Sequence, residues 1–79
     1  MHLNISGFFV DDREDDSLQF ELDIPTNREQ AILDVMKWKS LTDSPEGEFS
    51  LTPTQVQQIE FELQIVLPRH LALYIGVES

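Results

Sequence analysis

The 79-residue sequence contains no cysteine and only three glycines. The absence of cysteine excludes a disulfide framework and any zinc site built on thiolates, and it is compatible with a reducing compartment. With so little glycine there is no loop that could cradle a phosphate, and neither an HExxH nor a Gly-x-Ser-x-Gly motif occurs. We therefore expect a protein that has no cofactor, no metal and no catalytic activity.

Basic residues are also scarce. Five lysines and arginines stand against 15 aspartates and glutamates, which gives a net charge of −10. Phosphate backbones and anionic membrane surfaces repel such a chain, because binding to either relies on clustered Lys and Arg. We expect neither direct nucleic-acid binding nor membrane docking, whereas a basic protein partner is favoured by long-range attraction. The alternative is that the acidity serves only solubility.

Long hydrophobic runs are absent as well. The first residues, MHLNISGFFVDD, lack a basic region and an apolar stretch long enough for a signal peptide or a membrane span. This pattern predicts a soluble cytoplasmic protein. A chain of 79 residues corresponds to a single domain, 1–79. A domain of this size buries only about 60% of its unfolded surface, so its core is thin and leaves little room for an enclosed active site.

Alternating apolar residues predict two strands near the N-terminus. In residues 2–10 one row of alternate positions is apolar apart from Gly7, which favours a β-bulge at that glycine. Residues 17–24 (SLQFELDI) alternate strictly between apolar and polar. Because the charged residues DDREDD (11–16) join these two segments, we expect an antiparallel hairpin with an acidic tip.

A helix is predicted to begin at Thr26. Pro25 stops the second strand, and TNRE has the pattern of a capping box, in which the Thr26 hydroxyl accepts from the N–H of Glu29 and the Glu29 side chain accepts from the N–H of Thr26. Lys37 and Lys39 are expected in the last turn, where positive charge suits the helix dipole. The predicted buried stripe consists of Ala31, Ile32, Val35 and Met36.

A second helix is predicted after the capping box Thr52-Pro53-Thr54-Gln55, which places a proline at the first helical position. The letters FEL occur both at 20–22 and at 61–63, but only the second copy follows such a cap. We therefore expect a strand at the first copy, a helix at the second, and no internal repeat. The predicted buried stripe consists of Val56, Ile59, Leu63 and Val66.

Phe61 and Ile65 fall on the far face of this predicted helix, four residues apart. Either the helix ends near residue 64, or the pair is covered. The cover could be the sheet of the same chain or another protein, and the sheet is the favoured alternative.

The remaining segments complete the predicted fold. Residues 48–51 (EFSL) predict a short strand, and the run HLALYIGV (70–77) is apolar on both faces, which favours a central strand, with a short helix from Pro68 as the alternative. The sequence thus predicts a small two-layer α+β domain, with about four mainly antiparallel strands and two helices on one face. The predicted order is strand, strand, helix, strand, helix, strand.

The segment FELQIVLPRHLALYI (61–75) resembles the start of SUKH-superfamily immunity domains, in which a helix with a Glu-Leu pair runs into an Ile-x-Leu-Pro turn. The matching residues are Glu62, Leu63, Ile65, Leu67 and Pro68. In that family the proline opens a second helix, so the resemblance implies a helix over 69–75. It also implies a bacterial immunity protein that binds and silences a toxin, and no catalytic residues carry over.

The densest charge cluster consists of Asp11, Asp12, Glu14, Asp15 and Asp16. One interpretation is a calcium site, but the spacing lacks the glycine and the terminal Glu of an EF-hand loop, and a basic residue stands in the middle. A second interpretation is a phosphate-mimicking strip that meets the Lys and Arg of a nuclease or nucleic-acid-binding protein. The third is a solvated hairpin turn.

Trp38 lies between two lysines, away from the main apolar stripe. It is expected at the edge of the core, with an exposed binding anchor as the alternative. His2 and His70 belong to no recognisable catalytic motif, and no spacing links Ser, His and Asp into a triad. We expect His70 at the surface.

Together these features predict a small, acidic, non-catalytic binding protein of the inhibitor or immunity type, which occludes a basic partner such as a nuclease or a nucleic-acid-binding protein. The residues expected at the interface are Asp11, Asp12, Glu14, Asp15, Asp16, Glu21, Asp23, Trp38 and Phe61. The alternative is a structural or assembly subunit that associates through apolar surface, either as a homodimer or within a larger complex.

Overall fold

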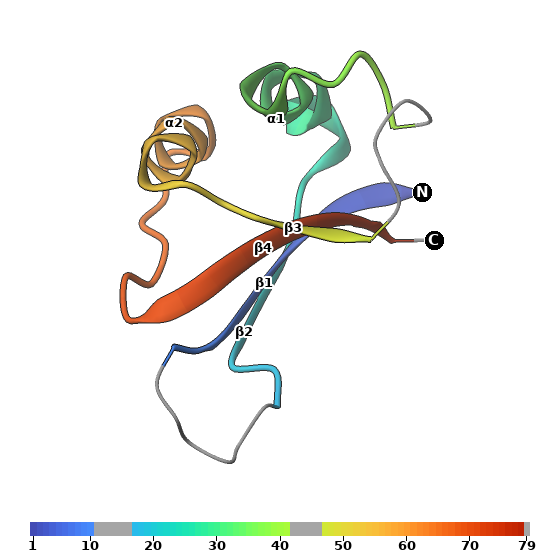
Figure 1. Cartoon of the computed structure of the whole chain (residues 1–79). Helices are drawn as coiled ribbons and strands as arrows, with labels where there is room; N and C mark the ends of the chain where they lie inside the picture. Colours follow the sequence, from blue (N-terminus) through green and yellow to red (C-terminus); the bar gives the residue numbers. More distant parts are fainter. Residues whose placement is uncertain (11–16, 42–46, 79) are drawn as a thin grey trace.

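The computed structural model describes residues 1–10, 17–41 and 47–78 (Figure 1). The predicted order of elements is confirmed. The elements are β1 (His2–Phe9), β2 (Phe20–Asp23), a 3-10 turn η1 (Thr26–Arg28), α1 (Glu29–Met36), β3 (Glu48–Ser50), α2 (Pro53–Leu63) and β4 (Leu71–Glu78).

The strands form one four-stranded sheet in the order β2-β1-β4-β3, and each neighbouring pair is antiparallel. The central strands β1 and β4 pair along their whole length, from His2 opposite Glu78 to Phe9 opposite Leu71. Both helices lie on the same face of the sheet (Figure 1). This arrangement is the α+β architecture that the sequence predicts.

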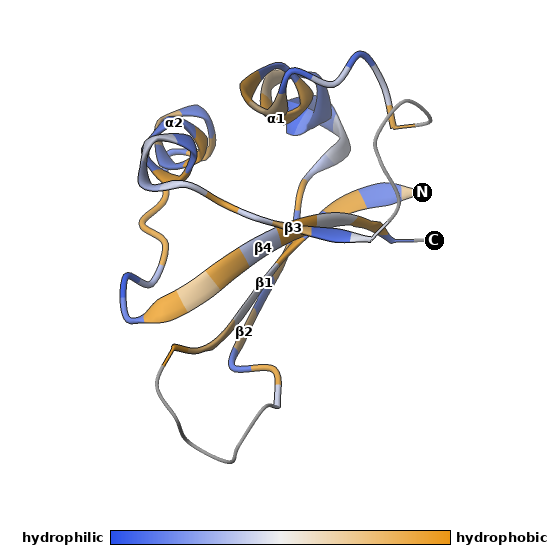
Figure 2. Ribbon diagram, viewed as in Figure 1, coloured by the Kyte–Doolittle hydropathy of each residue, from blue (hydrophilic) through white to orange (hydrophobic). Residues whose placement is uncertain are grey.

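An apolar core fills the space between the sheet and the two helices. Apolar residues run along both β1 and β4 (orange in Figure 2), and every second residue of each strand faces the helices. The buried members of the core are Leu3, Ile5, Ile24, Ile32, Leu33, Val56, Ile59, Leu67, Leu71, Leu73 and Ile75.

The capping box predicted at Thr26 does not form. Thr26 opens the 3-10 turn, and neither Pro25 nor Arg28, which occupy the two N-cap positions, makes a side-chain cap hydrogen bond. Because Thr26 already lies inside a helical turn, its hydroxyl is not in the flanking position from which a cap accepts. Helix α1 then ends at Met36, and Lys37 adopts the left-handed conformation (φ 61°, ψ 33°). The lysines predicted for the last turn therefore follow the helix.

The buried side of α1 also differs from the prediction. Ile32 and Leu33 are buried, whereas Ala31, Val35 and Met36 are only half-buried. The cause is that α1 contacts two neighbours: one side packs on the sheet, and the side that carries Ala31 and Val35 turns toward α2.

The capping box of α2 is confirmed. The N–H of Gln55 donates to Thr52 Oγ1 at 3.1 Å, and the N–H of Thr52 donates to Gln55 Oε1 at 2.9 Å. The helix ends at Leu63, with Gln64 in the left-handed conformation (φ 57°, ψ 44°), which agrees with the alternative that the helix ends near residue 64. Val66 lies beyond this end and is 87% exposed, so its predicted place in the buried stripe is wrong.

The β-bulge predicted at Gly7 is not present. Gly7 lies opposite Phe20 on β2 and Leu73 on β4, and neither register contains an inserted residue. A Cβ atom at this position would lie 3.0 Å from Leu71 Cδ1 and 3.1 Å from Phe20 Cβ. The glycine therefore makes room for apolar neighbours in the core.

The segment after Pro68 is a strand, as the apolar pattern of both its faces predicts. Leu71–Glu78 pairs with β1 on one side and with β3 on the other. The helix over 69–75 that the SUKH resemblance implies is therefore not formed. Within residues 1–10, 17–41 and 47–78, no helix is long and apolar enough to cross a membrane.

Candidate functional site

The face of the sheet turned away from both helices is the first candidate surface, and we call it the open face. Successive side chains of a strand point to opposite faces, so the strand registers assign its members. They are His2, Asn4, Ser6 and Phe8 of β1, Glu21 and Asp23 of β2, Glu48 and Ser50 of β3, and Ala72, Tyr74, Gly76 and Glu78 of β4.

Carboxylates stand at both lateral edges of this face. One row across the sheet reads Asp23, Asn4, Gly76 and Glu48. Three strand spacings separate the ends of this row, which places the backbones of Asp23 and Glu48 about 14 Å apart. Glu21 begins the next row on the β2 edge. The acidic groups thus frame the face and leave its centre to smaller and aromatic side chains.

The charge of the open face is of one sign. Glu21, Asp23, Glu48 and Glu78 are all exposed, and the described part of this face carries no lysine or arginine. The four described cations lie elsewhere: Arg28 belongs to η1, Lys37 and Lys39 follow α1, and Arg69 precedes β4. Since Coulomb potentials add, the open face is a surface of concentrated negative potential.

Asp23 is held in place by two neighbours from β1. Asn4 Nδ2 donates to Asp23 Oδ1 at 2.9 Å, and His2 Nε2 lies 3.0 Å from the same oxygen. The Asn4 amide holds the pKa of the Asp23 carboxyl below its usual value, and His2 adds to this effect, whereas desolvation opposes it. Asp23 therefore remains a fixed, ionised acceptor on the open face.

The centre of the open face is aromatic and closely covered. The rings of Phe8 and Tyr74 meet edge to face, with centroids 5.9 Å apart. Beside them Ser6 is only 4% exposed. A Cβ at Gly76 would lie 3.2 Å from Glu48 Cγ, so the Glu48 side chain lies over this glycine. An aromatic centre with a carboxylate frame is a suitable contact surface for the aliphatic stems and charged ends of Lys and Arg.

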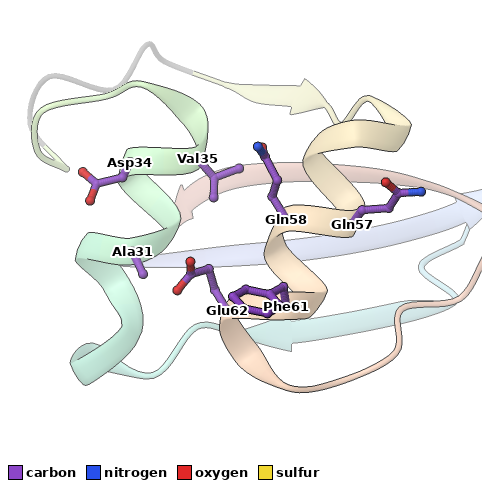
Figure 3. A pocket seen from close by; sticks show the side chains of 7 residues that line it. All are labelled: Ala31, Asp34, Val35, Gln57, Gln58, Phe61 and Glu62. Carbon is purple, nitrogen blue, oxygen red and sulfur yellow. The ribbon is translucent and has the colours of Figure 1, made fainter.

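The second candidate surface is a groove of about 530 Å³ on the outer side of the helix layer (Figure 3). Helix α1 contributes Ala31, Asp34 and Val35 to it, and α2 contributes Gln57, Gln58, Phe61 and Glu62. Phe61 is 72% exposed, which is unusual for a phenylalanine. We call this hollow the helix groove.

The structure distributes the sequence-predicted interface residues over separate regions. The acidic cluster 11–16, with both its calcium and its phosphate-mimic interpretations, lies outside the described residues. Glu21 and Asp23 are exposed on the open face, whereas Phe61 lies on the helix groove, in the opposite layer. The structure therefore brings the two β2 carboxylates together, but it does not bring Phe61 to them.

Trp38 and Ile65 are both packed against their own chain. Trp38 is half-buried, and its ring meets that of Phe49 edge to face with centroids 5.7 Å apart, which confirms the predicted place at the core edge. Ile65 is half-buried against the core and lines a small hollow with Leu22 and Leu63. Of the far-face pair, only Phe61 is left uncovered by the chain.

Sequence reasoning missed Glu48, Glu78 and the pairing of Phe8 with Tyr74. Each of these residues alternates with residues of its own strand that face the core, so its place on the side of the strand turned away from the core can be read locally. Their common position on one face depends on the strand order β2-β1-β4-β3, which no local pattern contains.

In the part of the chain that the structure describes, no group of three or more His, Cys, Asp and Glu side chains is arranged to hold a metal ion. His70 is exposed in the turn before β4, as predicted. Comparison of the sequence and structure with protein-family models, curated proteins and solved structures gives no match. The charges and contacts of this chain therefore carry the functional inference.

Proposed function

We propose that this protein is a non-catalytic acidic binding protein that occludes the basic surface of another protein through its open face. The observation that carries the proposal is the charge of that face, which has four exposed carboxylates and no lysine or arginine among its described residues. Such a surface attracts a basic partner over long range and repels acidic ones.

The acidic segment 11–16 adds to this proposal by its position in the sequence. It connects β1 to β2, and both strands contribute side chains to the open face. We propose that Asp11, Asp12, Glu14, Asp15 and Asp16 extend the same interface, which would then combine these carboxylates with Glu21 and Asp23.

The class of partner follows from the chemistry of the interface. Carboxylates spaced across a sheet can form ion pairs with Lys and Arg side chains that otherwise bind phosphates. The best-suited partner is therefore a nuclease or another nucleic-acid-binding protein. By covering the basic surface with which the partner binds nucleic acid, this protein would act as a competitive inhibitor of that binding. An immunity role is the particular case in which the inhibited partner is a toxin.

The test is affinity capture with two variants of equal charge change. The open-face variant Glu21→Gln/Asp23→Asn and the helix-side variant Asp34→Asn/Glu62→Gln each remove two negative charges. A basic protein captured at about 50 mM salt should be released at about 500 mM salt, because surface charges are then screened. It should also be lost from the open-face variant and kept by the helix-side variant.

A third variant, Asp11→Asn/Asp12→Asn/Asp15→Asn/Asp16→Asn, measures the share of the 11–16 segment. Equal capture by wild type, the open-face variant and this variant would contradict the proposal. Purified partner then allows the inhibition itself to be measured, as competition with a nucleic acid for the same protein.

A second candidate function is favoured by one observation, the 72% exposure of Phe61. It is assembly through apolar surface, either as a homodimer or within a larger complex. Sedimentation over a concentration series distinguishes the two functions, since apolar association persists in high salt and should be lost in Phe61→Ser. A monomer at all concentrations would exclude the homodimer.

A further inference from the structure

We propose that the helix groove binds an amphipathic helix of a partner protein, with apolar residues along one side of that helix and Lys or Arg beside them. This site lies in the helix layer, away from the open face, and it does not depend on the function proposed above.

The shape fits a helix. Figure 3 shows α1 and α2 side by side, running in opposite directions, with Val35 and Gln58 pointing into the space between them. Ala31 lies one turn before Val35 on α1, and its small side chain takes up little of the space between the helices. Two packed helices form a groove in which the side chains of a third helix can lie, by the same packing that joins helices within a domain.

The apolar residues of the groove lie where such a helix would make contact. Phe61 on α2 and Val35 on α1 stand on the two sides of the groove, and Phe61 is 72% exposed. A large aromatic side chain presented to solvent costs free energy that burial against a partner recovers, and such residues frequently dominate binding. An aliphatic stripe at helical spacing would cover Phe61 and extend to Ala31.

The charge selects a cationic partner. Both helices contribute a carboxylate to the lining: Glu62 of α2 points toward α1, whereas Asp34 lies on the side of α1 turned away from α2 (Figure 3). No residue among the described lining is a lysine or an arginine. Gln30 Nε2 donates to Asp34 Oδ1 at 3.0 Å, which fixes the position of that carboxylate. A helix with Lys or Arg beside its apolar stripe would therefore meet Glu62 between the helices and Asp34 at the outer rim of α1.

Charge and backbone chemistry argue against other occupants. A second copy of this chain, with a net charge of −10, would bring an acidic groove to an acidic groove. An extended peptide would gain no backbone hydrogen bonds, because both walls are helices whose backbone groups are already paired internally. A helix carries its own backbone hydrogen bonds and needs only side-chain contacts.

The experiment uses the full chain and a designed peptide of about 15 residues, with Leu at positions i, i+3, i+4 and i+7 and Lys on both flanks. The control peptide has the same composition, with the leucines scattered so that no stripe forms. Binding is followed by backbone amide shifts in NMR and by fluorescence anisotropy of the labelled peptide. The striped peptide should bind saturably and shift amides of α1 and α2, whereas the scattered peptide should bind at least about tenfold more weakly.

Three variants locate the site. Ala31→Leu fills the groove without changing charge, and Phe61→Ser removes the aromatic contact; each should weaken binding about tenfold or more. Asp34→Asn/Glu62→Gln should weaken binding at low salt and have little effect at high salt. Glu21→Gln/Asp23→Asn, which changes the open face by the same charge, should bind the peptide as wild type does. Thermal unfolding of each variant confirms that the comparison is made between folded proteins.

Four outcomes would overturn the proposal. They are equal binding of the two peptides, shifts confined to β-strand amides, unchanged affinity in both Ala31→Leu and Phe61→Ser, and sedimentation showing that Phe61 joins two copies of the chain. Shifts on the strands would support the open-face function while excluding the groove, so the two proposals can fail separately.

Discussion

Asn4 donates a hydrogen bond of 2.9 Å from its side-chain amide to Asp23 Oδ1, directly across the β1–β2 pair. The donor is 4% exposed, whereas the acceptor is exposed to solvent. A buried amide that lacks a partner costs free energy, so this contact both satisfies Asn4 and fixes a carboxylate at the edge of the open face. Fold stability and surface charge are thus coupled at one pair of residues.

Replacing Asn4 by alanine should raise the pKa of Asp23 toward its usual value, because the Asn4 hydrogen bond is the largest cause of its lowering. A lowered pKa in the folded state stabilises the fold above the pKa of the unfolded carboxyl, and this contribution is lost as the pH falls through the folded pKa. The free energy of unfolding of Asn4→Ala should therefore be lower than that of the wild type at neutral pH, and it should fall less than that of the wild type when the pH is lowered. NMR titration of the Asp23 carboxyl carbon measures the shift. Ser6→Ala, equally buried, is the control, and an unchanged pKa in Asn4→Ala would contradict the assignment.

The two capping-box patterns of the chain should differ in their contribution to stability. Thr52→Ala removes an acceptor that Gln55 uses at 3.1 Å, and it should lower the free energy of unfolding by about 1 kcal/mol. Thr26→Ala removes no cap, so its effect should stay within about 0.5 kcal/mol. Urea unfolding of both variants checks the difference. Equal losses would mean that the hydroxyl of Thr26 also caps a helix in solution.

These two threonines show how far local sequence can predict this fold. The pattern at Thr52 predicts its helix correctly because the cap, the proline and the apolar spacing all agree. At Thr26 the same pattern misleads, because Pro25 is followed at once by a 3-10 turn. The sequence predicts the strands well, because the alternation of apolar and polar residues is local and does not depend on the order of strands in the sheet.

The candidate surfaces were predicted only in part, since they depend on relations between distant residues. Glu21 and Asp23 were assigned to a solvated strand face from alternation alone, and the structure agrees. The meeting of Phe8 with Tyr74 requires β1 beside β4, and the helix groove requires Ala31 to turn toward α2. Such contacts are decided by packing across the whole domain, so neither the helical period nor the alternation along a strand predicts them.

Trp38, the only tryptophan in the chain, should report on the edge of the core. Its ring packs on Phe49 at a centroid distance of 5.7 Å, so Phe49→Ala should expose the indole and shift its fluorescence emission to longer wavelength. The same change should destabilise the fold by about 1–3 kcal/mol, because a half-buried aromatic residue is lost. Phe61→Ala is the matched control and should leave the emission unchanged. An emission maximum already typical of an exposed indole in the wild type would contradict this packing.

Glu60 should contribute more to stability than its ion pair suggests. Its Oε2 atom accepts from the backbone N–H of Leu67 at 2.7 Å, and its Oε1 atom accepts from the guanidinium of Arg69. Leu67 is fully buried, so Glu60→Ala leaves a shielded N–H without a partner and should cost about 1–3 kcal/mol.

Arg69→Ala is the matched test of that assignment. The Glu60 side chain is only 14% exposed, but that of Arg69 is 56% exposed, so solvent screens the charge of this ion pair on the arginine side. Arg69→Ala should therefore lose about 1 kcal/mol, less than Glu60→Ala. Glu60→Gln retains an acceptor for the Leu67 N–H and should fall between the two. If urea unfolding gives equal losses for Glu60→Ala and Arg69→Ala, the ion pair carries the effect. If only Glu60→Ala is destabilised, the hydrogen bond from the Leu67 N–H, which joins α2 to the segment that leads into β4, carries the effect.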